Sequence, residues 1–137
     1  MKSNHNSSQE DDVVGLALII VEAAIHSANL THSQLGSLKN GTTDENFYEV
    51  IELCEGLYGS VAGAGAFLHL AASRLRHHTD KEYRLAYNDL NITKEYAGWC
   101  HEEFLNYDVF YPPLLANREQ NLVQICEIAL SVISRLL

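Results

Sequence analysis

The chain has 137 residues, of which 47% are hydrophobic and 20% are charged, and its net charge is −9. This size suits one globular domain with a hydrophobic core of its own. The excess of Asp and Glu argues against a nucleic-acid-binding surface, because such surfaces depend on Lys and Arg.

The N-terminal segment and the cysteines bear on location. Residues 1–12 lack the basic start and the apolar run of a signal peptide. Cys54, Cys100 and Cys126 are an odd number of cysteines without CxxC spacing. We therefore expect free thiols in a reducing compartment and a cytoplasmic protein.

Two apolar segments fall short of a membrane span. Residues 13–25 are too few and include Glu22, whereas residues 56–73 are near the lower length limit and only weakly apolar. We expect no membrane partner.

The first helix is expected to begin near Ser8, after a disordered tail over residues 1–8, and residues 9–137 are expected to form a single domain. Its apolar residues keep helical spacing, weaken at residues 29–31, and resume before Gly41, a helix stop signal.

Two capping boxes predict the next two helix starts. Thr42–Glu45 opens a helix that continues to about Leu75, and Thr79–Glu82 opens one that continues to about Phe104. Residues 91–93 are a candidate kink in the latter helix.

A fourth helix is expected from Pro113, since proline is accepted in a first turn. The pattern contains neither strand alternation nor an internal repeat. Long helices with short connections predict an all-α, antiparallel bundle of about four helices. A break, if there is one, is expected in the first or the third helix.

The second helix contains an uncharged run of small residues, 56–73. Glycine inside a helix costs about 1 kcal/mol relative to alanine, so either a close helix–helix approach or, less often, a bound ligand must offset this cost. One side of the helix is the expected core face. The opposite side carries Gly56, Gly59, Gly63, Ala66, Phe67 and Leu70. A helix that is apolar on both sides is buried on both, and we therefore predict self-association through this second side.

Cationic residues gather around the expected turn between the second and third helices: Arg74, Arg76, His77, His78, Lys81 and Arg84. They either complement helix dipoles in solvent or bind a small anionic or nucleotide-like ligand. Acidic residues gather at the opposite end of the expected bundle, so the chain is electrically polar.

Five residues of types that bind metals are expected near one level of the bundle and are weak candidates for a metal site: Glu22, His26, Cys54, Cys100 and His101. These donors would suit zinc, but the cysteines serve equally well as small buried hydrophobes. The paired ExxH signature of di-iron bundles is missing. We predict no metal and no cofactor.

The segment His32–Ser37 resembles the motif of histidine phosphotransfer domains, which are four-helix bundles of similar size. His32, Gly36 and Ser37 match in spacing, while Leu35 occupies the place of the family's cation. This six-residue resemblance implies phosphotransfer, and the alternative is an ordinary surface histidine.

The expected loop before the fourth helix is aromatic, with Tyr107, Phe110 and Tyr111 close to two prolines. Aromatic residues in such a place form an interaction epitope or fold back as a lid over the bundle end. We favour the lid.

No catalytic motif supports an enzyme, since the chain has no nucleophile elbow, phosphate loop or HExxH sequence. We interpret it as a small acidic, non-enzymatic interaction protein of accessory, adaptor or inhibitor type, with itself or another protein as partner. The alternative is a bundle that binds a small anionic ligand. Metal binding and phosphotransfer are lesser alternatives.

Overall fold

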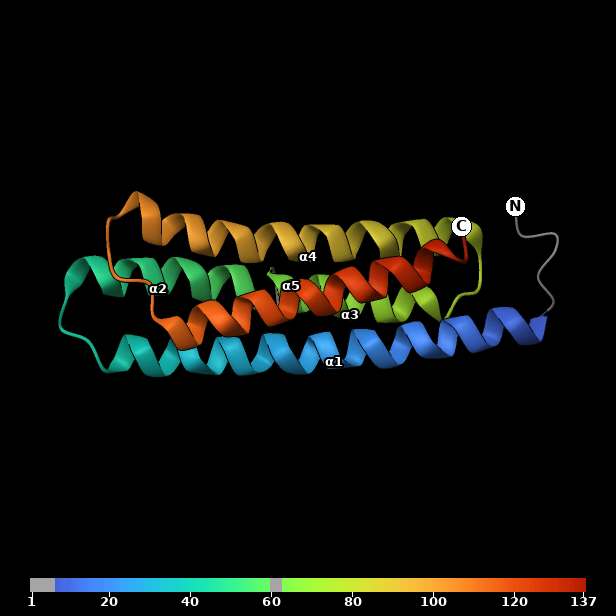
Figure 1. Ribbon diagram of the computed structural model, residues 1–137, viewed down its shortest axis with the longest axis horizontal. Helices are drawn as coiled ribbons and strands as arrows, with labels where there is room; N and C mark the ends of the chain where they lie inside the picture. The colour runs from blue at the N-terminus through green and yellow to red at the C-terminus, as the bar shows by residue number, and fades with distance from the viewer. Residues whose placement is uncertain (1–6, 60–62) are drawn as a thin grey trace.

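The computed structural model describes residues 7–59 and 63–137, and every regular element in these ranges is a helix. The helices, shown in Figure 1, are α1 (Ser7–Asn40), α2 (Glu45–Tyr58), α3 (Ala64–Leu75), α4 (Asp80–Asn106) and α5 (Pro113–Ser134). The expected all-α bundle is confirmed. Residues 1–6 of the expected tail lie outside the described part, and Ser7 and Ser8 already belong to α1.

The bundle has four antiparallel columns, because α2 and α3 follow one another and together fill one column (Figure 1). α1 packs against α5 on one side and against α2 and α3 on the other, and α4 completes the ring. The start of α1, the α3–α4 turn and the C-terminus lie at one end, which we call the terminal end. The α1–α2 and α4–α5 connections lie at the other, which we call the loop end.

The break in the bundle falls in the glycine-rich segment of the expected second helix. The prediction had placed any break in the first or the third helix. α1 and α4 are continuous, whereas the expected second helix stops at Tyr58 and a new helix begins at Ala64. Gly59 and Gly63, which flank the undescribed residues 60–62, both have extended backbone. The prediction of one continuous helix through these glycines is therefore wrong.

A close backbone approach explains why glycine occupies position 63. Its N–H donates to the carbonyl of Gly59 at 3.0 Å. A Cβ atom built on Gly63 would lie 2.5 Å from the Gly59 nitrogen and 2.6 Å from the carbonyl oxygens of Gly56 and Leu57. This glycine therefore serves the connection between α2 and α3 within one chain.

Local caps set the helix starts. Thr79 caps α4 as predicted, by accepting a hydrogen bond from the backbone N–H of Glu82 at 3.2 Å. The cap of α2 is Asp44, whose carboxylate accepts from the N–H of Phe47 at 2.8 Å, two residues beyond the predicted capping Thr42. α5 begins at Pro113, as expected.

The core is built from all five helices, and its large, fully buried side chains include Leu35, Ile51, Leu68, Leu75, Tyr83, Leu90, Phe104, Leu122 and Ile133. Within this core, a disulfide between Cys54 and Cys100 joins α2 to α4 across a Cα–Cα distance of 5.0 Å. The expectation of free thiols is therefore wrong for these two residues, and Cys126 remains a buried free thiol. The cytoplasmic location, which depended on that expectation, stays a prediction.

Candidate interaction surface

The α4–α5 connection at the loop end is short and has a defined backbone. Asp108 has φ 51°, in the left-handed region, so the chain turns sharply out of α4. Asp is one of the residue types that tolerates this conformation. The N–H of Val109 then donates to the carbonyl of Phe104 at 3.2 Å. α5 begins four residues later.

Two of the three aromatic residues in this connection fold back onto the bundle. The ring of Tyr111 stacks on His101 with centroids 4.8 Å apart and lies 4.7 Å from the ring of Phe104. The hydroxyl of Tyr107 donates to Glu49 at 3.2 Å. Tyr107 and Tyr111 thus fold back over the end of the bundle, as expected for a lid.

Phe110, by contrast, projects from the loop end with 72% of its surface exposed. Leu105 and Leu114, at the end of α4 and the start of α5, are 68% and 58% exposed. Phe110 also lines a hollow of about 480 Å³ between the two connections, together with Thr42, Asp44, Asn46, Phe47, Asp108 and Val109. The exposed ring of Phe110 therefore lies beside two carboxylates, those of Asp44 and Asp108.

A buried carboxylate holds the base of the connection. Glu119 of α5 is 4% exposed and accepts hydrogen bonds from the hydroxyls of Tyr58, at 2.6 Å, and Tyr111. Burial raises the pKa of Glu119 to about 7, although the two tyrosine hydrogen bonds act in the opposite direction. Glu119 therefore links α2, the loop and α5 through one side chain.

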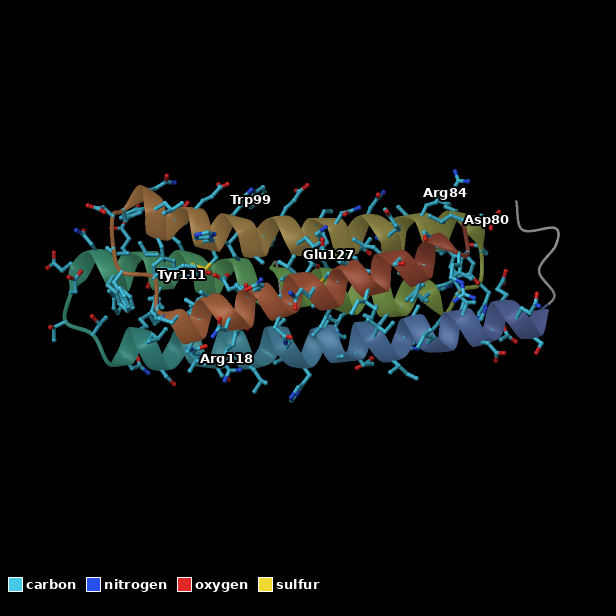
Figure 2. The ribbon with its side chains drawn as sticks, in the orientation of Figure 1. Asp80, Arg84, Trp99, Tyr111, Arg118 and Glu127 are labelled. Carbon is cyan, nitrogen blue, oxygen red and sulfur yellow. A yellow bond between two sulfur atoms is a disulfide. The ribbon has the colours of Figure 1, made fainter. Side chains whose placement is uncertain are left out.

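A groove of about 330 Å³ opens between α4 and α5 beside this carboxylate. It is lined by Ala97, Gly98, His101, Tyr111, Ala116, Glu119, Gln120 and Val123. In Figure 2 Tyr111 lies between these helices, whereas Trp99 projects outward from α4. Trp99 stacks on Tyr96 with centroids 5.0 Å apart, and Tyr96 meets Phe67 edge-on at 5.5 Å.

Carboxylates already face several of the cations at the terminal end. Arg74 pairs with the buried Asp89 at 3.2 Å, and burial raises the pKa of that carboxyl to about 6 despite the arginine charge. Arg76 lies 3.9 Å from Glu22.

The other members of this basic group lie farther out. His78 lies 3.6 Å from Asp11, and His77 is exposed. Lys81 and Arg84 line a separate shallow hollow of about 400 Å³, with Arg84 pointing away from the bundle (Figure 2). The group thus divides among several surroundings, and anion binding stays a prediction.

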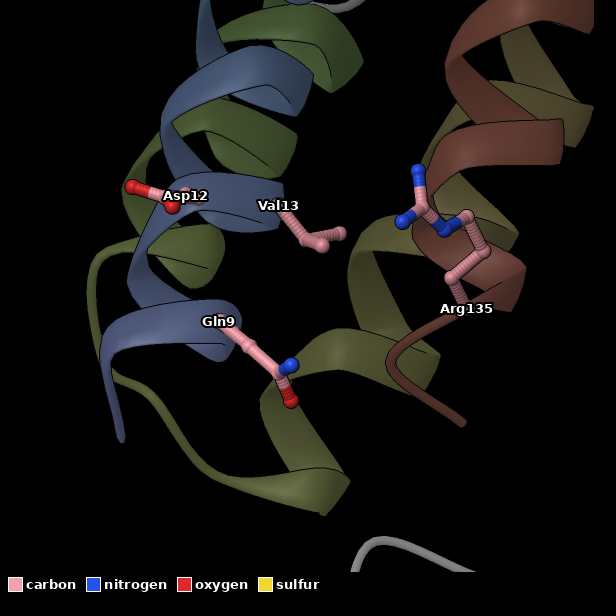
Figure 3. A pocket seen from close by; sticks show the side chains of 4 residues that line it. All are labelled: Gln9, Asp12, Val13 and Arg135. Carbon is pink, nitrogen blue, oxygen red and sulfur yellow. The ribbon is translucent and has the colours of Figure 1, made fainter. Parts of the chain in front are cut away.

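A second hollow of about 400 Å³ lies at the terminal end, between α1 and the residues after α5 (Figure 3). Gln9, Asp12, Val13 and Arg135 line this hollow, and the Asp12 carboxylate is directed away from Arg135 in this view. The hollow therefore offers few converging polar groups, which is a poor basis for a ligand site.

The weak metal-ligand set does not converge. Cys54 and Cys100 meet at one level, as predicted, but they form a disulfide. Glu22 and His26 are exposed on α1, and His101 stacks on Tyr111. Within residues 7–59 and 63–137, no three His, Cys, Asp or Glu side chains are placed to hold a metal ion. His32, of the phosphotransfer-like motif, is exposed on α1.

The expected glycine face is divided between two helices. Gly56 is exposed on α2 and Leu70 is 42% exposed on α3, whereas Gly63 is buried against the α2 backbone. Ala66 and Phe67 are half-buried, and Gly59 caps α2. Self-association through these residues stays a prediction.

Comparison with known proteins identifies a similar fold. No protein-family model matches the sequence, and the curated proteins contain no match. Among solved structures, the chain is similar to a crystal structure of a pectin methylesterase inhibitor from Arabidopsis thaliana, with a TM-score of 0.80 and 18% sequence identity. The similarity covers 98% of this chain and 81% of the other. At 18% identity, this similarity establishes the fold of the chain and nothing further.

Proposed function

We propose that this protein is non-enzymatic and acts as an inhibitor by binding a partner protein. The observation that carries this proposal is the similarity of nearly the whole chain to a helical protein that inhibits pectin methylesterase. Many functions share one fold, so fold similarity supports the class of function and the surface must supply the rest.

The loop end is the surface that best suits a protein partner. Exposed aromatic residues commonly dominate binding energy at interfaces, and Phe110 is the most exposed aromatic side chain among the described residues. Tyr107 and Tyr111 hold the connection on either side of Phe110 by hydrogen bonds to Glu49 and Glu119, which limits the backbone entropy lost on binding. The proposed partner has an apolar pocket for Phe110 and a basic rim facing Asp44 and Asp108.

The target of the similar protein supplies the first assay. We expect the purified chain to slow the release of methanol from methyl-esterified pectin by a pectin methylesterase. Phe110→Ala should weaken inhibition at least about tenfold, which corresponds to about 1.4 kcal/mol. Leu53→Ala, which removes a 43% exposed side chain on α2, should leave inhibition unchanged.

Each arm has an outcome that contradicts part of the proposal. If the unmodified chain neither binds nor slows the enzyme, pectin methylesterase is not the target. If both variants inhibit as well as the unmodified chain, the loop end is not the binding surface. Far-ultraviolet circular dichroism should confirm that both variants remain helical.

A further inference from the structure

α1 carries a second apolar stripe on the side away from the core. Leu16, Ile19 and Leu30 are 44%, 69% and 42% exposed, and Ala23 between them is also exposed. An 18-residue window in this helix has mean hydropathy 1.8, enough by length and composition to cross a membrane, and 44% of the window is buried. The core helix of a soluble protein and a signal sequence near the N-terminus both meet the same criterion, so it does not identify what contacts the stripe.

The stripe is symmetric about a small residue. Leu16 and Leu30 each lie seven residues from Ala23, which is about two helical turns. If two copies of α1 pack antiparallel about a two-fold axis at Ala23, Leu16 of each copy lies opposite Leu30 of the other. The contact then extends for about 21 Å along each helix, the length between these two leucines. The alanine permits close approach of the helices at the centre.

Charge along α1 favours this direction. Glu22 and His26 are exposed on one flank of the stripe, close to Ala23. Antiparallel packing about Ala23 brings Glu22 of each copy near His26 of the partner subunit, whereas parallel packing would set the two Glu22 carboxylates against one another. Glu10, Asp11 and Lys39 do not contribute, because they contact Tyr83, His78 and Glu55 of their own chain.

The apolar surface extends onto α5. Val13 and Arg135 line the same hollow, which fixes the antiparallel register of α1 and α5 (Figure 3). Two turns inward on each helix, Ile20 and Ile128 therefore lie at one level. Ile128 is 55% exposed and Ile20 is partly exposed, so the stripe on α1 has a neighbouring apolar contribution.

We infer that the outer face of α1, together with Ile128, binds a second copy of this chain in an antiparallel, two-fold arrangement. This interface differs from the glycine face predicted from the sequence. It lies along the side of the bundle, so the loop end remains free for another partner.

Sedimentation velocity of the full chain tests the assembly. The unmodified protein should be dimeric at about 100 µM and should dissociate on dilution. Ile19→Glu should be monomeric at the same concentration, because two charges would be buried at the interface. The matched control is Leu105→Glu, which alters a similarly exposed apolar residue on α4 and should remain dimeric. A monomeric unmodified protein, or a dimeric Ile19→Glu variant, would overturn the inference.

Cysteine cross-linking tests the arrangement. Ala23→Cys should form an intermolecular disulfide readily, because the two-fold axis passes beside this position. A mixture of Leu16→Cys and Leu30→Cys chains should cross-link faster than either variant alone. The native pair Cys54–Cys100 is already bonded and Cys126 is buried, so the introduced thiol is the accessible one. Faster cross-linking of Leu16→Cys to itself would contradict the antiparallel direction.

A vesicle arm separates this inference from membrane binding. The unmodified chain should not sediment with phosphatidylcholine vesicles. If it does, and Ile19→Glu does not, the stripe is a lipid contact and the inference is overturned. Phe110→Ala should remain dimeric, so failure of the inhibitor proposal would leave this result unaffected.

Discussion

Tyr58, the last residue of α2, donates its hydroxyl hydrogen to the buried carboxylate of Glu119 on α5 at 2.6 Å. The same carboxylate accepts from Tyr111 in the connection that presents Phe110. Glu119 thus joins the helix before the glycine-rich break to the proposed interaction surface. A change at this interior site is expected to alter both the stability of the bundle and the position of the loop.

Tyr58→Phe should lower the free energy of unfolding by about 1–3 kcal/mol, because it removes a donor and leaves a buried carboxylate less well satisfied. Chemical denaturation followed by circular dichroism measures the change. Tyr48→Phe is the matched control, since Tyr48 is 42% exposed and its ring can still contact Lys39. Equal stability of the two variants would show that the Tyr58 hydrogen bond contributes little.

Stability should fall as pH rises from 3.8 to about 7. In the folded protein the pKa of Glu119 is raised from 4.5 to about 7, and that of Asp89 from 3.8 to about 6. Across these windows the folded state holds protons that the unfolded state has released, so increasing pH favours unfolding. For Glu119, which is 4% exposed, the loss is on the order of 3 kcal/mol.

Melting temperatures measured at about pH 5 and about pH 8 test this direction. Glu119→Gln removes one titrating group and should flatten the profile between these values, whereas Glu52→Gln, at an exposed position on α2, should not. A profile of the unmodified protein that rises toward pH 8 would contradict the assignment of Glu119 and Asp89 as protonated buried groups.

Helix patterns in the sequence predict most of this fold. The stripes of apolar residues and the cap at Thr79 are local signals, and local signals suffice when each helix buries one face. The break between α2 and α3 could not be predicted, because a glycine-rich run between two helical patterns has the same periodicity whether or not the helix continues. The close backbone approach at Gly63, which requires glycine in the connection, is a tertiary contact that local patterns do not reveal.

The buried carboxylates had a usable signal in the sequence. Glu119 follows Leu115 by four residues and precedes Leu122 by three, so helical spacing places it on the core face of α5. Its partners could not be identified in this way, because Tyr58 lies 61 residues away on another helix. The disulfide was not predicted for a different reason. The odd number of cysteines favoured free thiols, but an odd number does not exclude one bonded pair.

Reduction of the disulfide should destabilise the protein by about 2–4 kcal/mol, because it releases a constraint on a long loop of the unfolded chain. Denaturation with and without a reductant measures this, and a Cys54→Ala, Cys100→Ala double variant should not respond to the reductant. Alkylation under denaturing, non-reducing conditions should label Cys126 and spare the other two. Labelling of all three cysteines would mean that the bond does not form.

Gly63→Ala should destabilise the protein although alanine favours helix and Gly63 directly precedes α3. The added methyl group would lie within 2.6 Å of three backbone atoms of the preceding turn, and backbone can move aside only if the α2–α3 connection shifts. We expect a loss of about 1–3 kcal/mol, as for other overpacked sites. Gly98→Ala is the matched control, because a Cβ there meets nothing within 4 Å in the middle of α4, and it should stabilise the helix by up to about 1 kcal/mol. Thermal denaturation of the two variants gives opposite shifts if glycine is required at position 63 by close backbone contact, and parallel shifts if it is an ordinary helix residue.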